Sequence, residues 1–134
     1  MLDSYIGIPF QSHGRTRAGC DCWGLLRLVY TEQLGLELPS FAEDYVTSAD
    51  REAIAGLIAG NLGGWSQIPA GHEQALDGVL MRGFGGIGHI GVVVQPGLVL
   101  HVQFGCTSRI ERYRSGPLAQ RVRGLYRYTA PVIA

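Results

Sequence analysis

The sequence DCWGLLRLVYTEQLG, residues 21–35, carries the clearest structural signal in the chain. It begins with Asp21, a residue type that caps helix N-termini, and it ends with Gly35, a residue type that ends helices in the left-handed conformation. Between them, apolar residues follow Cys22 at spacings of three, four and seven, which is the period of a helix with one apolar face. The stretch therefore predicts a helix from Cys22 to about Leu34, with a cysteine at its first position.

The segments around this helix differ in pattern. Residues 6–20 are rich in glycine and polar residues and predict a loop, and Pro39 to Tyr45 predicts an irregular connection. Apolar spacing over residues 54–58 predicts a second helix that ends near Gly60, and residues 62–78 predict another loop. Five short strands are predicted after it: Val79–Arg82, His89–Val94, Leu98–Phe104, Ser108–Tyr113 and Arg123–Thr129. Helices followed by strands predict an α+β fold, with N-terminal helices packed on a C-terminal antiparallel sheet of about five strands.

Length and composition limit the class of protein. The 134 residues are expected to form one domain, residues 1–134. A hydrophobic content of 46% with 16% charged residues excludes a disordered chain, and a net charge of zero argues against a dedicated nucleic-acid-binding protein. Three cysteines are too few for a disulfide scaffold and predict free thiols. The N-terminus lacks the pattern of a signal peptide and no apolar run is long enough to span a bilayer, so we expect synthesis in the cytoplasm and no membrane insertion.

The charges divide unevenly along the chain. Residues 30–78 hold eight acidic residues and one Arg, whereas residues 79–134 hold seven Arg and one acidic residue. One interpretation is two solvated faces of one domain. The other is an Arg-lined surface, including Arg109, Arg112 and Arg114, that binds an acidic partner or a carboxylate-rich substrate, since Arg binds carboxylates through two parallel hydrogen bonds.

Three residues could together carry thiol chemistry. Cys22 is expected at a helix start, where the helix dipole and unpaired amide groups favour a thiolate, although a cysteine there can equally be a small buried hydrophobic residue. Thiol catalysis needs a base within hydrogen-bond reach and a group that orients the base. His89 would be the base and later the acid, and His101, on the next predicted strand, would fix the tautomer of His89.

Strand register decides whether the two imidazoles can meet. A two-residue turn at Pro96-Gly97 pairs Gln95 with Leu98, which places His89 and His101 on opposite faces of the sheet. A three-residue loop, or a bulge that corrects the parity, places both on one face. The thiol chemistry needs one of these last two arrangements.

Other polar residues are weaker candidates. His13 and His72 are both expected at the surface, and His13 is the stronger candidate because it lies in the loop that leads to Cys22. Cys20 and Cys106 are expected to be structural or incidental. A redox or metal pair of Cys20 and Cys22 is an alternative, because two such cysteines can bind zinc when a second ligand pair completes the site. Cys106 and one of the two strand histidines could supply that pair. We nevertheless expect no metal and no cofactor.

The motifs around the helix start resemble those of a known family. The motifs that resemble the N-terminal region of NlpC/P60 cell-wall cysteine peptidases are YIGIPF, HGR and GCDCWGL, at residues 5–10, 13–15 and 19–25. More narrowly, they resemble the phage branch of the family, the tail-tip peptidases and tail assembly proteins. GHIGVV at residues 88–93 is similar to the family's catalytic histidine strand, and His101 resembles its third polar residue. The resemblance extends from residue 5 to about residue 128.

The resemblance implies a papain-like α+β fold and hydrolysis of an amide in peptidoglycan stem peptides, commonly between γ-D-glutamyl and diaminopimelate. It implies that Cys22, His89 and His101 are catalytic, with the backbone amide of Cys22 helping to form an oxyanion hole. Asp21 matches a family position that can help to hold the free amine of the stem peptide. The implied partners are peptidoglycan stem peptides and phage tail-tip proteins, and the implied location is a virion tail acting at the host cell wall.

Two positions depart from the family pattern. Phe10 stands where the family usually has Tyr, and Trp23 stands where it often has Ser. Both changes affect the expected substrate pocket, to which we assign Asp21, Phe10, Trp23 and His13. They favour an alternative function, a tail assembly or structural protein that keeps the fold with little or no hydrolase activity.

Overall fold

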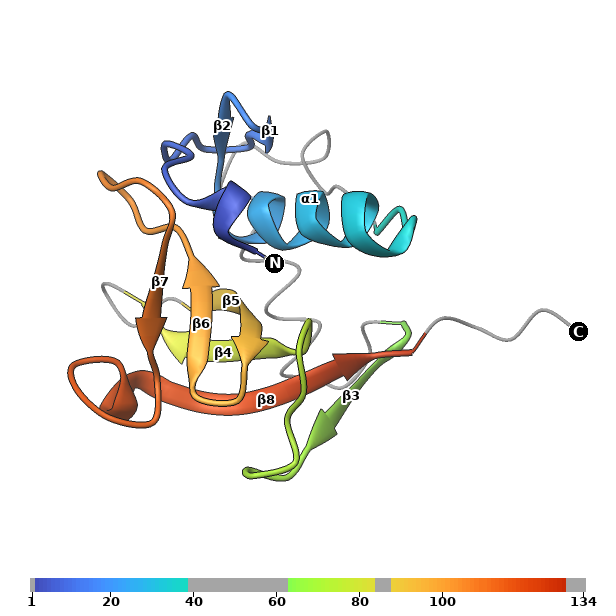
Figure 1. The fold of residues 1–134 in the computed structure, drawn as a ribbon, viewed down its shortest axis with the longest axis vertical. Coiled ribbons are helices and arrows are strands. Elements are labelled where there is room, and N and C mark those ends of the chain that lie inside the picture. Colours follow the sequence, from blue (N-terminus) through green and yellow to red (C-terminus); the bar gives the residue numbers. More distant parts are fainter. Residues whose placement is uncertain (1, 39–62, 84–87, 130–134) are drawn as a thin grey trace, which may run out of the picture.

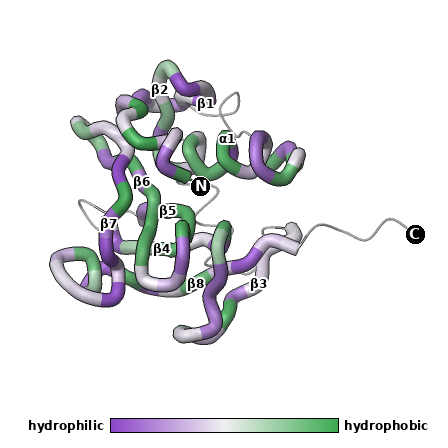
Figure 2. Tube along the Cα trace, in the orientation of Figure 1, coloured by the Kyte–Doolittle hydropathy of each residue, from purple (hydrophilic) through white to green (hydrophobic). Residues whose placement is uncertain are grey.

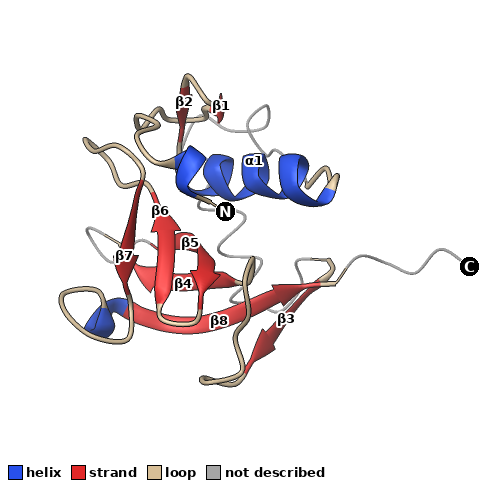
Figure 3. Cartoon of the chain, viewed as in Figure 1, coloured by secondary structure: helices blue, strands red, loops and turns tan. Residues whose placement is uncertain are grey.

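The computed structural model describes residues 2–38, 63–83 and 88–129 of the chain. Within these ranges, one long helix lies across one side of a curved antiparallel sheet (Figures 1 and 3). In chain order the elements are η1 (Asp3–Tyr5), β1 (Arg15–Thr16), β2 (Gly19–Cys20), α1 (Cys22–Leu34), β3 (Trp65–Ile68), β4 (Gly78–Arg82), β5 (Gly88–Gln95), β6 (Leu98–His101), β7 (Arg109–Arg112), η3 (Ala119–Arg121) and β8 (Val122–Tyr128). The arrangement confirms the predicted α+β fold.

Helix α1 has the bounds that the sequence predicts. The Asp21 side chain accepts a hydrogen bond from the backbone N–H of Gly24, and Gly35 ends the helix in the left-handed conformation at φ 66°. The predicted second helix, and the irregular connection that begins at Pro39, fall outside the described residues. Among the residues that the structure describes, no helix combines the length and the apolar character needed to cross a membrane.

The sheet has six strands, in the order β3-β8-β4-β5-β6-β7, rather than about five. The additional strand is Trp65–Ile68, which the sequence places in a loop and which pairs antiparallel with β8. Its centre is polar, at Ser66 and Gln67, and two glycines precede it, so its sequence lacks the apolar alternation of a strand. This strand forms because β8 offers a partner, and that partner is distant in the sequence.

Two other boundaries differ from the prediction. The segment expected to be a loop at residues 6–20 contains the short hairpin of β1 and β2. Strand β6 ends at His101 rather than at Phe104, because the carbonyl of Gln103 accepts the backbone N–H of Cys106 in a turn. The chain therefore leaves the sheet directly after the second histidine.

Hydrophobic residues cover both faces of the central strands. On one face the sheet packs against α1, through Leu25, Leu26, Val29, Ile90, Val92 and Leu100. On the other face a second core contains Val79, Met81, Val93, Val99, Tyr113, Leu118 and Leu125. Figure 2 shows the hydrophobic character of β6, which contributes to both cores. Because each fully buried aliphatic side chain contributes about 1.5–3 kcal/mol, β5 and β6 form a rigid support for the residues they carry.

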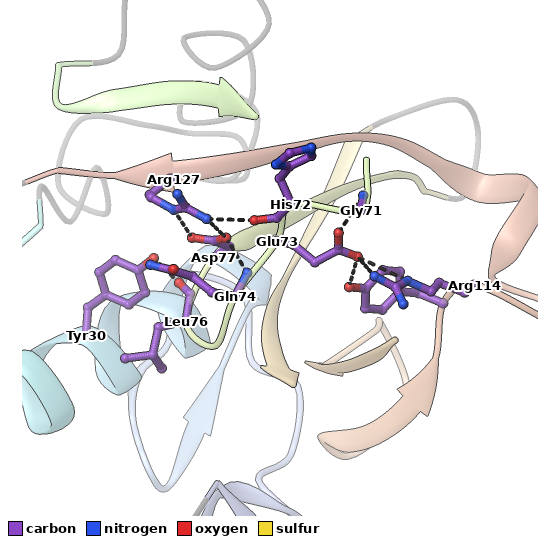
Figure 4. Close-up of polar contacts among 10 residues, drawn as sticks. Tyr30, Gly71, His72, Glu73, Gln74, Leu76, Asp77, Arg114 and Arg127 are labelled. Carbon is purple, nitrogen blue, oxygen red and sulfur yellow. Dashed lines mark hydrogen bonds and ion pairs between the residues drawn. The ribbon is translucent and has the colours of Figure 1, made fainter. Parts of the chain in front are cut away.

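A buried carboxylate fixes the loop before β4. Glu73 accepts hydrogen bonds from the backbone N–H of Gly71 at 2.9 Å, from the hydroxyl of Tyr113, and from the guanidinium of Arg114 at 2.9 Å (Figure 4). Its side chain is 1% exposed. Since Tyr113 and Arg114 directly follow β7, this carboxylate joins the loop to the end of that strand.

Asp77 fixes the same loop to β8. Its carboxylate accepts hydrogen bonds from Nε and Nη2 of Arg127, at 3.0 and 2.9 Å, and from the backbone N–H of Gln74 at 2.8 Å. The acidic and arginine-rich parts of the chain therefore form ion pairs with each other. We call Glu73, Asp77, Tyr113, Arg114 and Arg127 the loop-anchoring cluster.

Candidate active site

Asp21 closes the N-terminus of α1. Its fully buried carboxylate accepts hydrogen bonds from the backbone N–H groups of Gly24 at 2.8 Å and His13 at 2.9 Å. The guanidinium of Arg15 lies 2.7 Å from it and supplies the positive partner that a buried charge needs. Cys22 follows as the first helical residue and is buried, so the predicted position of this thiol at a capped helix start is confirmed. The contact of Asp21 with a substrate amine stays a prediction; here both its oxygens bond to the protein.

Gly24 lets the preceding loop pack directly on the first turn of α1. A Cβ at this position would lie 2.0 Å from the carbonyl oxygen of Gly14 and 2.9 Å from Nη1 of Arg15. The same Nη1 donates to that carbonyl at 2.7 Å. His13, in the left-handed conformation at φ 61°, turns the loop toward the helix. The loop and the helix start therefore form one unit, and the glycine of the DCWG sequence has a steric explanation.

A β-bulge brings the two strand histidines onto one face. The β5–β6 turn has two residues and pairs Gln95 with Leu98, which alone would separate the imidazoles. The register shifts between Val93 and Gln95, and this bulge restores the parity. His89 and His101 consequently share a face of the sheet, so the bulge that the sequence offered as one solution is confirmed.

The two imidazoles are hydrogen-bonded and continue to a carboxylate. Nε2 of His89 lies 2.8 Å from Nδ1 of His101, and Nε2 of His101 lies 3.2 Å from Oε1 of Glu111 on β7. Burial lowers the pKa of His89, and the charges of His101 and Arg121 lower it further. Burial also lowers the pKa of His101, against the opposing effect of Glu111. Both rings are therefore neutral at pH 7. We call His89, His101 and Glu111 the histidine chain.

Gly91 makes room for this arrangement. A Cβ at Gly91 would lie 2.5 Å from Cγ2 of Val99 and 3.1 Å from Cβ of His101. Any larger residue would push the His101 strand away from β5. The glycine in the sequence His-Ile-Gly is therefore explained by the close approach of the strand that carries the second histidine.

The histidine pair and the helix lie on opposite faces of the sheet. His89 pairs across the strands with Met81, which belongs to the second core, whereas α1 packs on the face that carries Ile90. Helix α1 contacts both β5 and β6, and its N-terminal end lies above the tip of β6 in Figure 1. The structure thus brings His89 and His101 together and places Cys22 at the end of the helix that crosses these strands. The contact between the Cys22 thiol and His89 stays a prediction.

The remaining expected pocket residues occupy different environments. Phe10 is half-buried and meets Phe104 edge to face, with ring centroids 5.5 Å apart. Trp23 is fully buried and packs on Trp65 with centroids 6.2 Å apart, so in this structure it is a core residue. The roles of Phe10, Trp23 and His13 at a substrate stay predictions.

The three cysteines are free thiols, as the sequence predicts. Cys20 is buried and donates a hydrogen bond from its thiol to the carbonyl of Thr16 at 3.0 Å. Burial, with the nearby charge of Asp21, raises the pKa of Cys20 to about 11, which supports a structural role. Cys106 is exposed. In the described ranges, no three His, Cys, Asp or Glu side chains gather around a position that could hold a metal ion.

Two polar residues of this region were not recognised in the sequence. Glu111 is the single acidic residue after residue 78, and that isolation among arginines is the signal that could have identified it. Gln103 follows His101 by two residues, and its buried Oε1 has no hydrogen-bond partner among the described residues. An unsatisfied buried acceptor costs about 1–3 kcal/mol, which marks Gln103 as a candidate for contact with a substrate.

Comparisons with known proteins agree with this architecture. The NlpC domain of the peptidoglycan hydrolase SagA is similar at 18% identity and a TM-score of 0.60, over 91% of this chain and 88% of that chain. An NLP/P60 family protein from Staphylococcus aureus Mu50, described as similar to lipoprotein, has 19% identity and a TM-score of 0.66, over 96% of this chain and 39% of that chain. An NlpC/P60 family protein from Bacillus cereus ATCC 10987 has 19% identity and a TM-score of 0.64, over 92% of this chain and 36% of that chain. This chain therefore spans less than half the length of the last two proteins.

The fold is thus the mixed helix and antiparallel sheet of NlpC/P60 structures. The NlpC/P60 family model matches residues 7–127 of the sequence. The chain belongs to the NlpC/P60 family. A search of curated protein sequences found no match.

Proposed function

We propose that this protein is a cysteine peptidase that hydrolyses an amide bond in peptidoglycan stem peptides. The observation that carries the proposal is the hydrogen-bonded pair His89–His101, on the strands that are crossed by the helix beginning with Cys22. Membership in the NlpC/P60 family supports the reaction class, and the similar SagA domain comes from a peptidoglycan hydrolase. The lowered pKa of His89 keeps its imidazole neutral at pH 7, and the neutral ring is the form that can accept a proton from a thiol.

In the proposed mechanism Cys22 is the nucleophile and His89 is the base. His89 takes the thiol proton, and the thiolate attacks the amide carbonyl carbon to form a tetrahedral intermediate. The backbone N–H of Cys22, at the first position of the helix, would donate to the developing oxyanion. The intermediate expels the amine, which receives the proton from His89. Water, deprotonated by His89, then hydrolyses the thioester and releases the free thiol.

The proposal sets a geometric requirement. Since His89 and α1 lie on opposite faces of the sheet, the thiol and the imidazole would meet where the first turn of α1 passes the beginning of β5. The bonds of Asp21 to the loop before the helix hold that first turn in place.

We propose the bond between γ-D-glutamyl and diaminopimelate as the scissile amide, and a phage or prophage tail as the setting. The support is the resemblance of residues 5–25 to the phage branch of the family. The protein would be made in the bacterial cytoplasm, assemble with tail-tip proteins, and act at the host cell wall. Mass spectrometry of digested synthetic stem peptides would identify the bond.

The experiment that tests the activity is digestion of purified sacculi with wild type, Cys22→Ala and Cys106→Ala. Wild type and Cys106→Ala should release the same stem-peptide fragments, because Cys106 is an exposed residue outside the site. Cys22→Ala should release none while it keeps the thermal midpoint of wild type within a few degrees. A folded wild type that releases no fragments from sacculi or synthetic peptides would contradict the proposal.

The second candidate function is a tail assembly protein that keeps the fold without hydrolysis. Phe10 lacks the hydroxyl that the family usually has at this position. Trp23, which directly follows the cysteine, is fully buried in the core. This candidate predicts a folded, inactive wild type that binds other tail proteins. Pull-down with purified tail-tip proteins, beside the digestion above, distinguishes the two functions.

A further inference from the structure

Glu111 is the carboxylate at the far end of the histidine chain. It lies on β7, the edge strand of the sheet, where it pairs across the strands with Val99. Its Oε1 lies 3.2 Å from Nε2 of His101 and also contacts Nε of Arg109. The side chain of His101 is fully buried and that of Glu111 is 27% exposed. The carboxylate therefore joins a buried imidazole to the protein surface.

The two contacts of His101, with Glu111 and with His89, determine where the protons lie. An ionised carboxylate can only accept a hydrogen bond, so Nε2 of His101 carries a proton. A neutral imidazole has a single N–H, which leaves Nδ1 of His101 as an acceptor. The 2.8 Å contact with Nε2 of His89 then requires the proton on that nitrogen of His89. Nδ1 of His89 is left with a free lone pair.

The surrounding charges favour neutral rings. Among the described residues, the charged groups besides Glu111 that act on the two imidazoles are Arg109 and Arg121, and both disfavour an imidazolium. Burial acts in the same direction on both rings. With both rings neutral, the carboxylate is the group that breaks the symmetry between the two possible directions of the His89–His101 hydrogen bond.

We propose that Glu111 is a positioning residue that fixes the tautomers of both histidines and thereby leaves Nδ1 of His89 as the base. The tautomer assignment stands on the contacts between neutral rings, and the base role rests on the proposed peptidase function. When the thiol gives its proton to Nδ1, the S–H bond breaks and an N–H bond forms at that nitrogen. His89 keeps its Nε2–H on His101, and Glu111 faces the resulting positive charge through the neutral ring of His101.

A purely structural role for Glu111 predicts something different. A half-exposed ion pair with Arg109 contributes little to stability, and its loss would leave the imidazoles unchanged. Ring protonation, which reports on the nitrogens directly, therefore separates a positioning role from a structural one.

The test is ¹⁵N NMR of the histidine rings in wild type, Glu111→Leu and Arg109→Gln at pH 7.5. In wild type both rings should be protonated at Nε2 and unprotonated at Nδ1. Glu111→Leu removes the acceptor, so the hydrogen bond between the rings should reverse and His89 should carry its proton on Nδ1. Arg109→Gln keeps the carboxylate and should keep the wild-type signals. Should Glu111→Leu fail to fold, Glu111→Gln, whose amide both donates and accepts, should give a mixture of the two tautomers.

Wild-type rings protonated at Nδ1, or wild-type signals in Glu111→Leu, would overturn the assignment, whatever the activity of the protein. In the sacculus assay Glu111→Leu should lower kcat by about 10–100-fold with KM unchanged, the cost typical of an outer hydrogen-bond partner of a functional histidine. Reversed tautomers with an unchanged kcat would overturn the role in catalysis. An inactive wild type would count against the proposed function only, since the ring signals remain measurable.

Discussion

The molecule contains two networks of carboxylates and arginines that use burial in opposite ways. In the loop-anchoring cluster the carboxylate is buried, with the Glu73 side chain 1% exposed, and the guanidinium of Arg114 is half-exposed. In the histidine chain the carboxylate of Glu111 is 27% exposed and the buried groups are the imidazoles of His89 and His101. Both networks join segments that are adjacent in space and distant in the sequence, but they bury different chemical groups.

The difference lies in which group can change its protonation. Burial raises the pKa of Glu73, but hydrogen bonds from Tyr113, Gly71 and Arg114 outweigh it and lower that pKa to about 2. Its charge is therefore fixed at any physiological pH, as expected of a structural contact. The imidazoles have lowered pKa values and are hydrogen-bonded to each other and to Glu111. Perturbed bases of this kind are typical of functional sites.

The largest expected effect on stability comes from Glu73→Ala. The substitution leaves the hydroxyl of Tyr113 and the N–H of Gly71 without their acceptor, and it should lower the free energy of unfolding by about 3 kcal/mol. Urea denaturation measures the change, and Glu37→Ala, at an exposed position, is the control. Sacculus digestion per folded molecule should stay at the wild-type level. A loss below about 0.5 kcal/mol, in the range of surface substitutions, would show that this cluster does not anchor the loop.

Gly91→Ala should affect both stability and activity. The new methyl group would lie 2.5 Å from Val99 and 3.1 Å from Cβ of His101, so the strands must separate, at a cost of about 2 kcal/mol. The movement displaces His101 from His89, and activity should fall more than stability alone explains. Gly63→Ala is the matched control, because a Cβ there meets nothing within 4 Å. Equal activities of the two variants would mean that the spacing of the histidine pair is not critical.

These expectations also show which parts of the structure the sequence could predict. The bounds of α1 were predictable because its signals, Asp21 and Gly35, lie next to the helix that they delimit. Strand β3 was not, since its four residues are ordered by pairing with β8, about sixty residues away in the chain. Local patterns predict local structure, whereas pairing partners depend on the whole fold.

The candidate site divides in the same way. Cys22, His89 and His101 were identified from residue type and spacing, but the bulge that unites the two histidines could only be offered as one of several registers. The role of Glu111 could not be predicted from the sequence, because its contact with His101 depends on how β7 aligns with β6. Trp23 was expected beside the substrate from its position in the family pattern; it is fully buried, and its role at a substrate stays a prediction.

The two networks should lose their contributions to folding stability over different pH ranges. The pKa values of His89 and His101 are lower in the folded state than the usual 6.5, so the unfolded chain binds more protons below that value. Stability should therefore be complete above pH 6.5 and fall as the pH decreases, by at most about 1.4 kcal/mol per pH unit for each histidine. Glu73 has a lowered pKa and loses its contribution only between about pH 4.5 and 2. Denaturation at pH 7.5 and 5.5 should thus show a loss of about 1 kcal/mol from His89, with a further loss from His101, and His89→Gln should reduce the total. Equal slopes in wild type and His89→Gln would contradict the buried neutral ring.

The smallest expected effect is the difference in stability between variants of Arg114 and Arg109, the arginines that contact the two carboxylates. Arg114→Gln removes the cation from a buried carboxylate, and because Arg114 is half-exposed and Glu73 keeps two other donors, the cost should be about 1 kcal/mol. Arg109→Gln removes the cation from a carboxylate that is 27% exposed and keeps its contact with His101, so the cost should be below about 0.5 kcal/mol. Both arginines are about equally exposed, at 51% and 50%, so the difference isolates the burial of the carboxylate. Paired urea denaturation curves measure it, and raising the salt concentration should weaken the Arg109 effect more, because screening acts on the more exposed pair. If Arg109→Gln proved the more costly variant, Glu111 would be a structural contact, and the contrast between a fixed carboxylate and a proton-positioning one would no longer hold.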